Sequence, residues 1–186
     1  HLVFVTVVLM DMRDKIAVFC SARHDIDPKY NEAARLFVRG AAALGFKIVS
    51  GGTVKGTMGE ISDELEKCGG YHIGVVPRFM TKFAYPSLSE LVWTDTLAER
   101  KAVFQTDTRA VVALPGGIGT LDEVMDTFSL LYLGKYDGKV CLLNYKGFYE
   151  PLLALLHHYV DQKMMSEETL NRLVVASTPE ELLLKL

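Results

Sequence analysis

Two glycine-rich stretches of this sequence end in the same pattern, Gly-Thr-x-x-Glu, and each could bind an anion. The first is SGGTVKGTMGEIS at residues 50–62, and the second is LPGGIGTLDEV at residues 114–124. Glycine lets backbone N–H groups approach a ligand, and a helix N-terminus adds unpaired donors and partial positive charge. Together these features favour a phosphate group.

The same pattern also fits a capping box, in which a threonine and a glutamate three residues later cap the first turn of a helix. Thr57 with Glu60 and Thr120 with Glu123 have this spacing. Capping does not explain three glycines within the four positions 116–119. We therefore expect both threonine turns to cap helices and to help bind an anion. We expect Glu123 to be a reactive carboxylate and Glu60 only a cap.

The loops do not match the common nucleotide motifs. Gly51 and Gly56 have Walker A spacing, but Thr57 and Met58 stand where that loop has Lys and Ser or Thr. Neither loop contains Gly-x-Gly-x-x-Gly, the dinucleotide fingerprint. The loops thus favour a mononucleotide or a sugar phosphate over a nucleoside triphosphate or NAD.

The composition indicates one globular domain. The chain has 186 residues, of which 49% are hydrophobic and 23% charged. Its net charge is -3 and no basic block stands out, so we expect no nucleic acid or membrane partner. Its three cysteines form no Cys-x-x-Cys pair, which argues against disulfides and a zinc site. We expect reduced thiols in the cytoplasm, no metal and no cofactor.

The first 14 residues form an N-terminal extension. Residues 1–9 are apolar but too few to span a bilayer, and they lack the basic leader and cleavage site of a signal peptide. They are either left over ahead of a start at Met10 or Met12, or an added strand, and the sequence leaves both open.

Strand-like and helix-like segments alternate from Lys15 to the end of the chain. Continuous apolar strands with helices between them predict a three-layer, doubly wound α/β fold over residues 15–186, a Rossmann-like and mainly parallel sheet with helices on both faces. Residues 78–90 are expected to be a loop. Strands are expected at 15–20, 46–50, 71–77, 90–95, 109–115 and 139–144, and helices at 28–44, 57–68, 96–107, 121–133, 149–161, 167–173 and 179–186.

In such a sheet, ligands bind beyond the carboxyl ends of the strands. Ser21 and the two glycine loops follow expected strands, so they would converge if those strands are neighbours. Arg100 and Lys101 could supply charge near a bound phosphate ester. A solvated helix face explains these two residues as well, and the pattern alone does not choose.

PGGIGTLDE at residues 115–123, together with ERK at residues 99–101, resembles the signature of the LOG ("lonely guy") family, whose members were long mislabelled as lysine decarboxylases. The likeness extends over nearly the whole chain from Lys15. VFCSA resembles the family's first strand and turn, SGGTVKGTMG its glycine loop, and LLYLGKYDGKVCLLNYKGFYEPLL the stretch after the signature.

The resemblance implies a doubly wound fold, usually a homodimer, and a phosphoribohydrolase. Such an enzyme cleaves the N-glycosidic bond of a nucleoside 5'-monophosphate, releasing the free base and ribose 5-phosphate. In cytokinin-producing organisms the base is an N6-substituted adenine. The matching positions imply that Arg100 and Glu123 are the catalytic pair. With the loop chemistry, they lead us to expect substrate binding by Ser21, Gly52, Thr53, Gly56, Thr57, Met58, Gly59, Lys101, Pro115, Gly116, Gly117, Gly119, Thr120 and Asp122.

Three residues depart from the family pattern and leave the identity of the base open. Thr53 replaces a usual third glycine, Thr57 replaces a frequent leucine, and Lys82 lies where an acidic residue is common. Two other functions are therefore kept. One is a non-catalytic nucleotide or cofactor carrier, which would not need a carboxylate at the sugar. The other is a pyridoxal-phosphate lysine decarboxylase, for which no Schiff-base lysine is evident.

Overall fold

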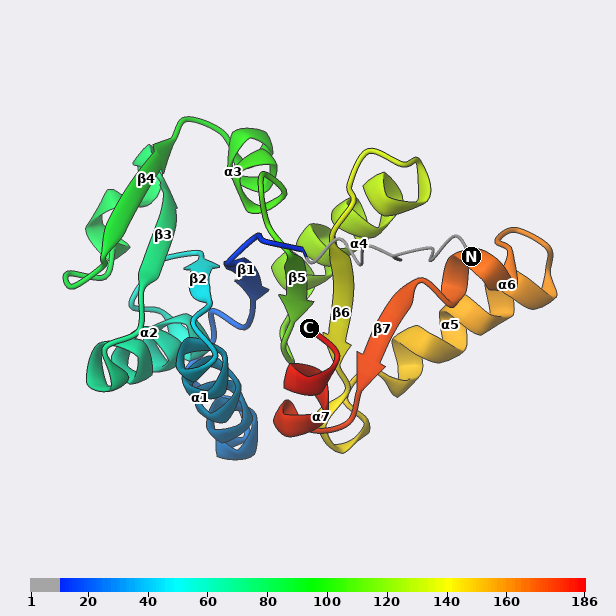
Figure 1. Cartoon of the computed structure of the whole chain (residues 1–186), viewed down its shortest axis with the longest axis horizontal. Coiled ribbons are helices and arrows are strands. Elements are labelled where there is room, and N and C mark those ends of the chain that lie inside the picture. Colours follow the sequence, from blue (N-terminus) through cyan, green and yellow to red (C-terminus); the bar gives the residue numbers. More distant parts are fainter. Residues whose placement is uncertain (1–10) are drawn as a thin grey trace, which may run out of the picture.

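A single parallel sheet forms the centre of the computed structural model, which describes residues 11–186 (Figure 1). Its strand order is β4-β3-β2-β1-β5-β6-β7, and every neighbouring pair is parallel. The predicted doubly wound α/β fold is confirmed. An added strand before Met10 would lie outside the described residues. The strands are β1 Lys15–Phe19, β2 Lys47–Ser50, β3 His72–Pro77, β4 Glu90–Thr94, β5 Ala110–Ala113, β6 Lys139–Leu143 and β7 Leu173–Ala176.

Helices follow nearly every strand, as parallel pairing requires. None of those within residues 11–186 is both long enough and apolar enough to cross a membrane. Three short elements were not predicted: β7, the 3-10 helix η1 within the expected loop, and the 3-10 helix η2. The helices are α1 Pro28–Ala43, α2 Gly56–Cys68, η1 Arg78–Phe83, α3 Leu97–Phe104, α4 Ile118–Tyr132, η2 Tyr145–Gly147, α5 Glu150–Asp161, α6 Glu167–Leu170 and α7 Pro179–Leu184.

The alternation of side chains along β1 shows how both faces of the sheet are buried. Ile16 and Val18 belong to a core shared with α1, α2 and α7. Ala17 and Phe19 belong to a second core shared with α3 and α4 on the opposite face. Successive strand residues point to opposite sides, so a continuous apolar run needs helices on both faces. Figure 1 shows these two helical layers on either side of the strands.

The order of the strands places a crevice beside β1. The chain moves outward from β1 to β4 and then returns to β5, the other neighbour of β1. The loops after β1 and β5 therefore run to opposite faces, and the gap between them is the usual ligand site of such sheets.

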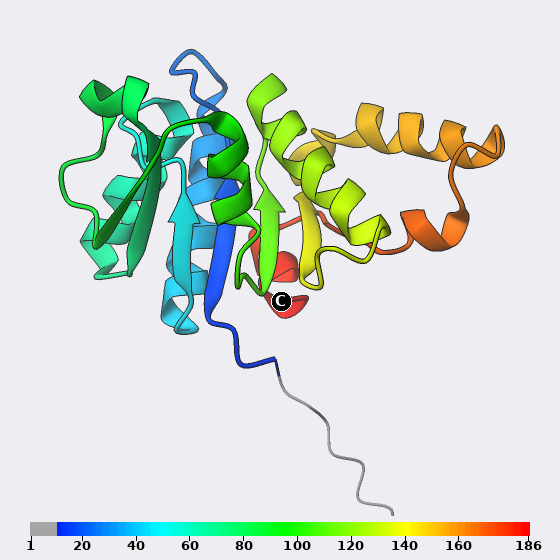
Figure 2. The same cartoon turned by 90° about the horizontal axis from the view of Figure 1, so that it is seen from above.

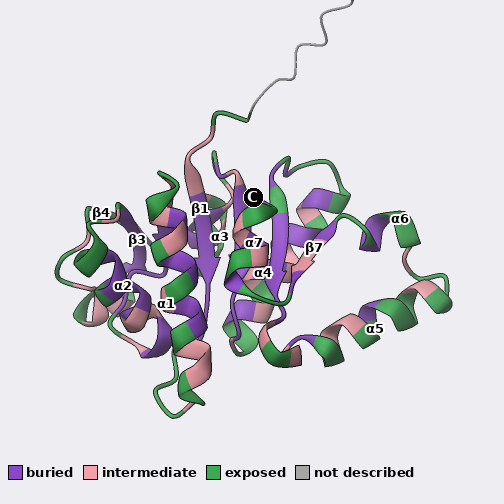
Figure 3. Ribbon diagram, turned by 60° about the horizontal axis from the view of Figure 1, so that its bottom comes forward, coloured by how far each residue is buried: buried purple, intermediate pink, exposed green. Residues whose placement is uncertain are grey.

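Helix α5 stands apart from the body of the protein. Together with α6 it extends away from the sheet, as Figure 2 shows. Within α5, Leu156 is the one buried residue, and the remainder of the helix is exposed or half-buried (Figure 3). Leu152, Leu153, Leu156 and Val160 pack against the core, whereas Leu155 and Tyr159 are exposed.

A close approach between Gly52 and Gly74 makes the start of the first glycine loop intolerant of side chains. Gly52 has φ +61°, and a Cβ there would lie 2.5 Å from the Gly74 Cα. We expect Gly52→Ala to lower the free energy of unfolding by about 3 kcal/mol, combining backbone strain and overpacking. Gly69→Ala is the matched control, since Gly69 has φ +69° but open space around it, and should lose about 1 kcal/mol. Equal losses in urea unfolding would contradict the steric explanation.

Candidate active site

A cavity of about 330 Å³ lies at the carboxyl end of β1, in the crevice between β1 and β5. The turn after β1, the start of α4 and one face of α3 form most of its wall. Its lining residues are Val18, Phe19, Cys20, Ser21, Ala22, Arg23, Gly51, Met58, Met80, Arg100, Phe104, Gly117, Ile118, Gly119, Thr120 and Glu123.

Arg100 is buried in this cavity and is held by backbone carbonyls. Its Nε donates to the Val75 carbonyl at 2.9 Å, and its Nη2 donates to the Gly51 carbonyl at 3.0 Å. Its guanidinium also lies 5.5 Å from the centre of the Phe104 ring. Burial lowers the pKa of Arg100, and the charge of Glu123 opposes this effect. A guanidinium nevertheless stays protonated in proteins, so the cavity contains a fixed positive charge.

Glu123 faces the same cavity from the second turn of α4. Burial raises its pKa to about 7, although the Arg100 charge acts in the opposite direction. Among the described residues, no hydrogen bond or ion pair joins Arg100 to Glu123. The carboxyl group is therefore unpaired, and it can gain or lose a proton near neutral pH.

The start of α4 offers an anion site that is not capped by a side chain. Gly117 is the N-cap residue, so the predicted capping by Thr120 is wrong: the helix begins two residues before this threonine. The first helical hydrogen bond runs from Leu121 N–H to the Gly117 carbonyl at 3.0 Å. Within residues 11–186, the N–H groups of residues 118–120 and the buried Thr120 Oγ1 have no hydrogen-bond partner. These donors are free to bind an anion.

Comparison with known proteins decides the family. Residues 58–186 match the family described as possible lysine decarboxylase. The chain is 32% identical over 173 residues to the cytokinin riboside 5'-monophosphate phosphoribohydrolase of Mycobacterium tuberculosis, covering 90% of each chain. It is 34% identical over 170 residues to the protein of that name from Mycobacterium marinum, again covering 90% of each. This chain belongs to the LOG family.

A solved structure of a protein named for another function has a similar fold. The molybdenum cofactor binding protein from Rippkaea orientalis superposes with a TM-score of 0.72, covering 94% of this chain and 96% of its own. The two sequences are 23% identical, so the likeness concerns the fold alone.

The first glycine loop is built differently from the LOG signature at α4. Helix α2 begins at Gly56 with Lys55 as its N-cap residue, so the predicted cap by Thr57 is also wrong. The Thr57 hydroxyl instead donates to Asn31 Oδ1 at 2.8 Å. Glu60 forms an ion pair with Arg35 at 2.6 Å and does not cap. This loop is thus tied to α1 and contributes little to the cavity.

The structure brings seven of the predicted site residues to the cavity: Ser21, Met58, Arg100, Gly117, Gly119, Thr120 and Glu123. It places the others elsewhere, although their roles in binding stay predictions. Lys101 Nζ lies 3.3 Å from both Asp122 and Asp126, which turns it away from the cavity. The predicted site residues that do not line the cavity are Gly52, Thr53, Gly56, Thr57, Gly59, Lys101, Pro115, Gly116 and Asp122.

Sequence reasoning missed several lining residues. Arg23 follows Ser21 by two positions, so its place beyond a strand end could have been noticed. Met80 lies in η1, and no local pattern in the sequence indicates that this segment folds back onto the site. Phe104 lies one helical turn after Arg100 on α3, and Ile118 lies between Gly117 and Gly119 at the start of α4. Within the described chain, no group of three or more His, Cys, Asp or Glu is placed to hold a metal ion.

The raised pKa of Glu123 predicts a pH-dependent effect on stability. The folded protein keeps this proton up to about pH 7, whereas the unfolded chain releases it near 4.5. Stability from this group is therefore complete below about 4.5 and is lost as the pH rises to about 7. Glutamine cannot ionise, so we expect the change in free energy of unfolding caused by Glu123→Gln to be more favourable at pH 8 than at pH 4.5 by roughly 3 kcal/mol.

Urea unfolding at the two pH values measures this difference. Glu32→Gln, at an exposed position of α1, is the control and should show no comparable pH dependence. An identical effect of Glu123→Gln at both pH values would contradict the burial of an unpaired carboxylate.

Proposed function

We propose that this chain hydrolyses the N-glycosidic bond of a nucleoside 5'-monophosphate to a free base and ribose 5-phosphate. One observation carries the proposal: Arg100 and Glu123 line one cavity without pairing, beside the free amides of α4. The phosphoribohydrolases that are 32% and 34% identical to the chain support the same reaction.

Glu123 is suited to the chemical step. As the bond between C1' and the base nitrogen breaks, its electron pair leaves with the base and positive charge develops on the ribose. The Glu123 carboxylate stabilises this charge and accepts a proton from the attacking water, whose oxygen bonds to C1'. The same proton can then pass to the base nitrogen, which balances the reaction. A pKa of about 7 suits both accepting and returning a proton.

Arg100 is suited to binding an anionic or hydroxyl oxygen of the substrate. A guanidinium has five N–H donors, and the described contacts with Val75 and Gly51 use two of them. The other donors can bind a ligand while the backbone keeps the side chain in place. Binding of a substrate oxygen by Arg100 is compatible with this geometry, since its described contacts leave Glu123 unpaired.

The start of α4 is suited to the 5'-phosphate. Its free amides would donate to the phosphate oxygens, and the helix dipole would favour the negative charge. The buried Thr120 hydroxyl would gain the acceptor that it lacks. A phosphate bound here would hold the ribose close to Glu123, which lies three residues after Thr120 on the same helix and lines the same cavity.

The reaction can be tested with AMP, N6-isopentenyl AMP, adenosine and ADP, with the free base measured by chromatography. We expect cleavage of a monophosphate, and a kcat/KM for adenosine roughly 100-fold lower because the phosphate contacts are lost. Glu123→Gln should lower turnover by about 100-fold or more while Glu32→Gln changes it little. Cleavage of adenosine as fast as AMP would overturn the role given to α4.

The same assay separates the other functions. A carrier would bind nucleotide and release no base. A pyridoxal-phosphate decarboxylase needs a lysine to form the Schiff base. The described lining of the cavity contains no lysine, and Lys101 is paired with Asp122 and Asp126. The geometry therefore favours the hydrolase over the reaction in the family's older description.

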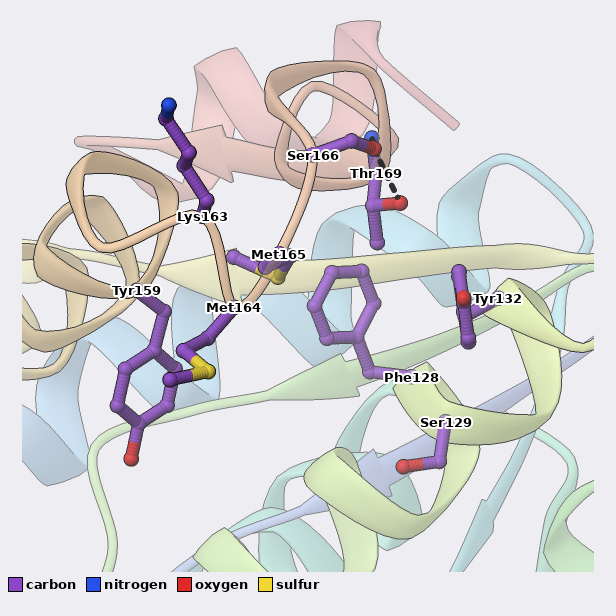
Figure 4. Close-up of a pocket in the computed structure, with 9 residues that line it drawn as sticks. All are labelled: Phe128, Ser129, Tyr132, Tyr159, Lys163, Met164, Met165, Ser166 and Thr169. Carbon is purple, nitrogen blue, oxygen red and sulfur yellow. Dashed lines mark hydrogen bonds between the residues drawn. The ribbon is translucent and has the colours of Figure 1, made fainter.

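We also propose that two copies associate through α4 and α5. A groove of about 450 Å³ runs between these helices, with Phe128 and Tyr132 on one wall and Tyr159 and Met164 on the other (Figure 4). Tyr132 is 62% and Met164 81% exposed. Aromatic and methionine side chains are enriched at protein interfaces. A two-fold axis would set the same apolar face of α4 in each copy against the other.

This assembly predicts that a charge on the outer face of α4 separates the copies. We expect Tyr132→Glu to convert a dimer to a monomer in light scattering, because the introduced carboxylate would be buried without a partner. Leu44→Glu is the control, since Leu44 is exposed to 61%, nearly as much as Tyr132, but lies at the end of α1. A wild-type protein that is monomeric at tens of micromolar would refute the dimer.

A further inference from the structure

We propose that Ser50 and His72 are positioning residues that fix the peptide group on which Arg100 rests. Ser50 is the last residue of β2 and His72 the first of β3. Both are buried, and Ser50 Oγ lies 2.7 Å from His72 Nε2. The kinetic part of this inference rests on the proposed hydrolase, whereas its structural part does not.

One peptide unit connects this pair to the active site. Ser50 Oγ accepts a hydrogen bond from Gly52 N–H at 3.1 Å. That N–H belongs to the same planar peptide as the Gly51 carbonyl, which accepts from Arg100 Nη2 at 3.0 Å. The N–H and C=O of a trans peptide point in opposite directions, so fixing one fixes the other. Ser50 therefore determines where the Gly51 carbonyl meets the guanidinium.

This peptide needs such an anchor because glycines flank it on both sides. A Gly-Gly peptide has few steric barriers and could rotate its carbonyl away from Arg100. Gly51 cannot gain a side chain to restrict it, because a Cβ there would collide with the Arg100 guanidinium. The Ser50 hydroxyl supplies the restraint instead.

His72 completes the anchor by holding the serine hydroxyl. Because Ser50 Oγ accepts from Gly52, its own hydrogen is available for the ring nitrogen of a neutral histidine. Burial keeps this ring neutral by lowering its pKa to about 4. The histidine main-chain N–H in turn donates to Ser89 Oγ at 3.0 Å, which fixes the start of β3.

The kinetic test uses Ser50→Ala and His72→Phe, which remove the hydroxyl and the ring nitrogens. We expect kcat for a nucleoside monophosphate to fall about tenfold with KM within twofold, because Arg100 is misplaced in the transition state. Cys141→Ala, a buried change in β6, controls for lost packing and should leave kcat unchanged. In an Arg100→Lys background Ser50→Ala should have almost no further effect. An undiminished tenfold loss there would overturn the proposal.

A second measurement does not depend on activity. The Arg100 Nη2–H signal, whose partner is the Gly51 carbonyl, should exchange with solvent at least tenfold faster in a ¹⁵N-correlated NMR spectrum of either variant than in the wild type or Cys141→Ala. Unchanged exchange in folded variants would overturn the positioning role. A wild type that releases no base would refute the hydrolase, while this measurement would still decide the inference. If Ser50→Ala does not fold, His72→Phe provides both readouts.

Discussion

The binding of Arg100 by two backbone carbonyls is the interaction on which the rest of the site depends. A guanidinium buried beside a carboxylate would ordinarily form an ion pair, which favours the charged forms of both groups. Here the carbonyls of Gly51 and Val75 occupy two of its donors, and Glu123 stays unpaired with a pKa of about 7. Helix α3 thus supplies a fixed positive charge that these carbonyls hold in place, and α4 supplies a carboxyl group that can still exchange a proton.

The two glycine loops look alike in sequence but serve this arrangement in different ways. The loop after β5 leads into α4 at the cavity wall, which leaves the amides of residues 118–120 free for a ligand. The loop after β2 uses its glycines for close packing: Gly52 lies against Gly74, and a Cβ on Gly59 would collide with Val54. Its contribution to the cavity is Gly51, whose carbonyl holds Arg100, and Met58. The crevice lies between β1 and β5, which explains why the second loop dominates.

Much of the fold and part of the site could be predicted from the sequence, because continuous apolar runs indicate buried strands and the loops that follow such strands indicate where ligands bind. The six predicted strands are present, and Arg100 and Glu123 share a cavity although 23 positions separate them in the sequence. The short strand β7 was missed because four apolar residues after a helix give little periodicity. The caps were misplaced because both helices begin at or before the last glycine of their loop, one or two residues ahead of the threonine. The fold of η1 over the site depends on tertiary contacts that no local pattern encodes.

The choice of Gly117 as the N-cap of α4 is best explained by the ligand. A serine, threonine or aspartate at this position would ordinarily stabilise the helix by accepting from its first amides. Neither space nor conformation prevents one, since a Cβ at Gly117 would meet nothing within 4 Å and its φ of −97° suits any residue. Such a side chain would, however, occupy the amides to which we propose that the phosphate binds. The uncapped helix, the unpartnered Thr120 hydroxyl and the unpaired Glu123 therefore fit one explanation: local stability is given up where the proposed substrate would supply the missing partners.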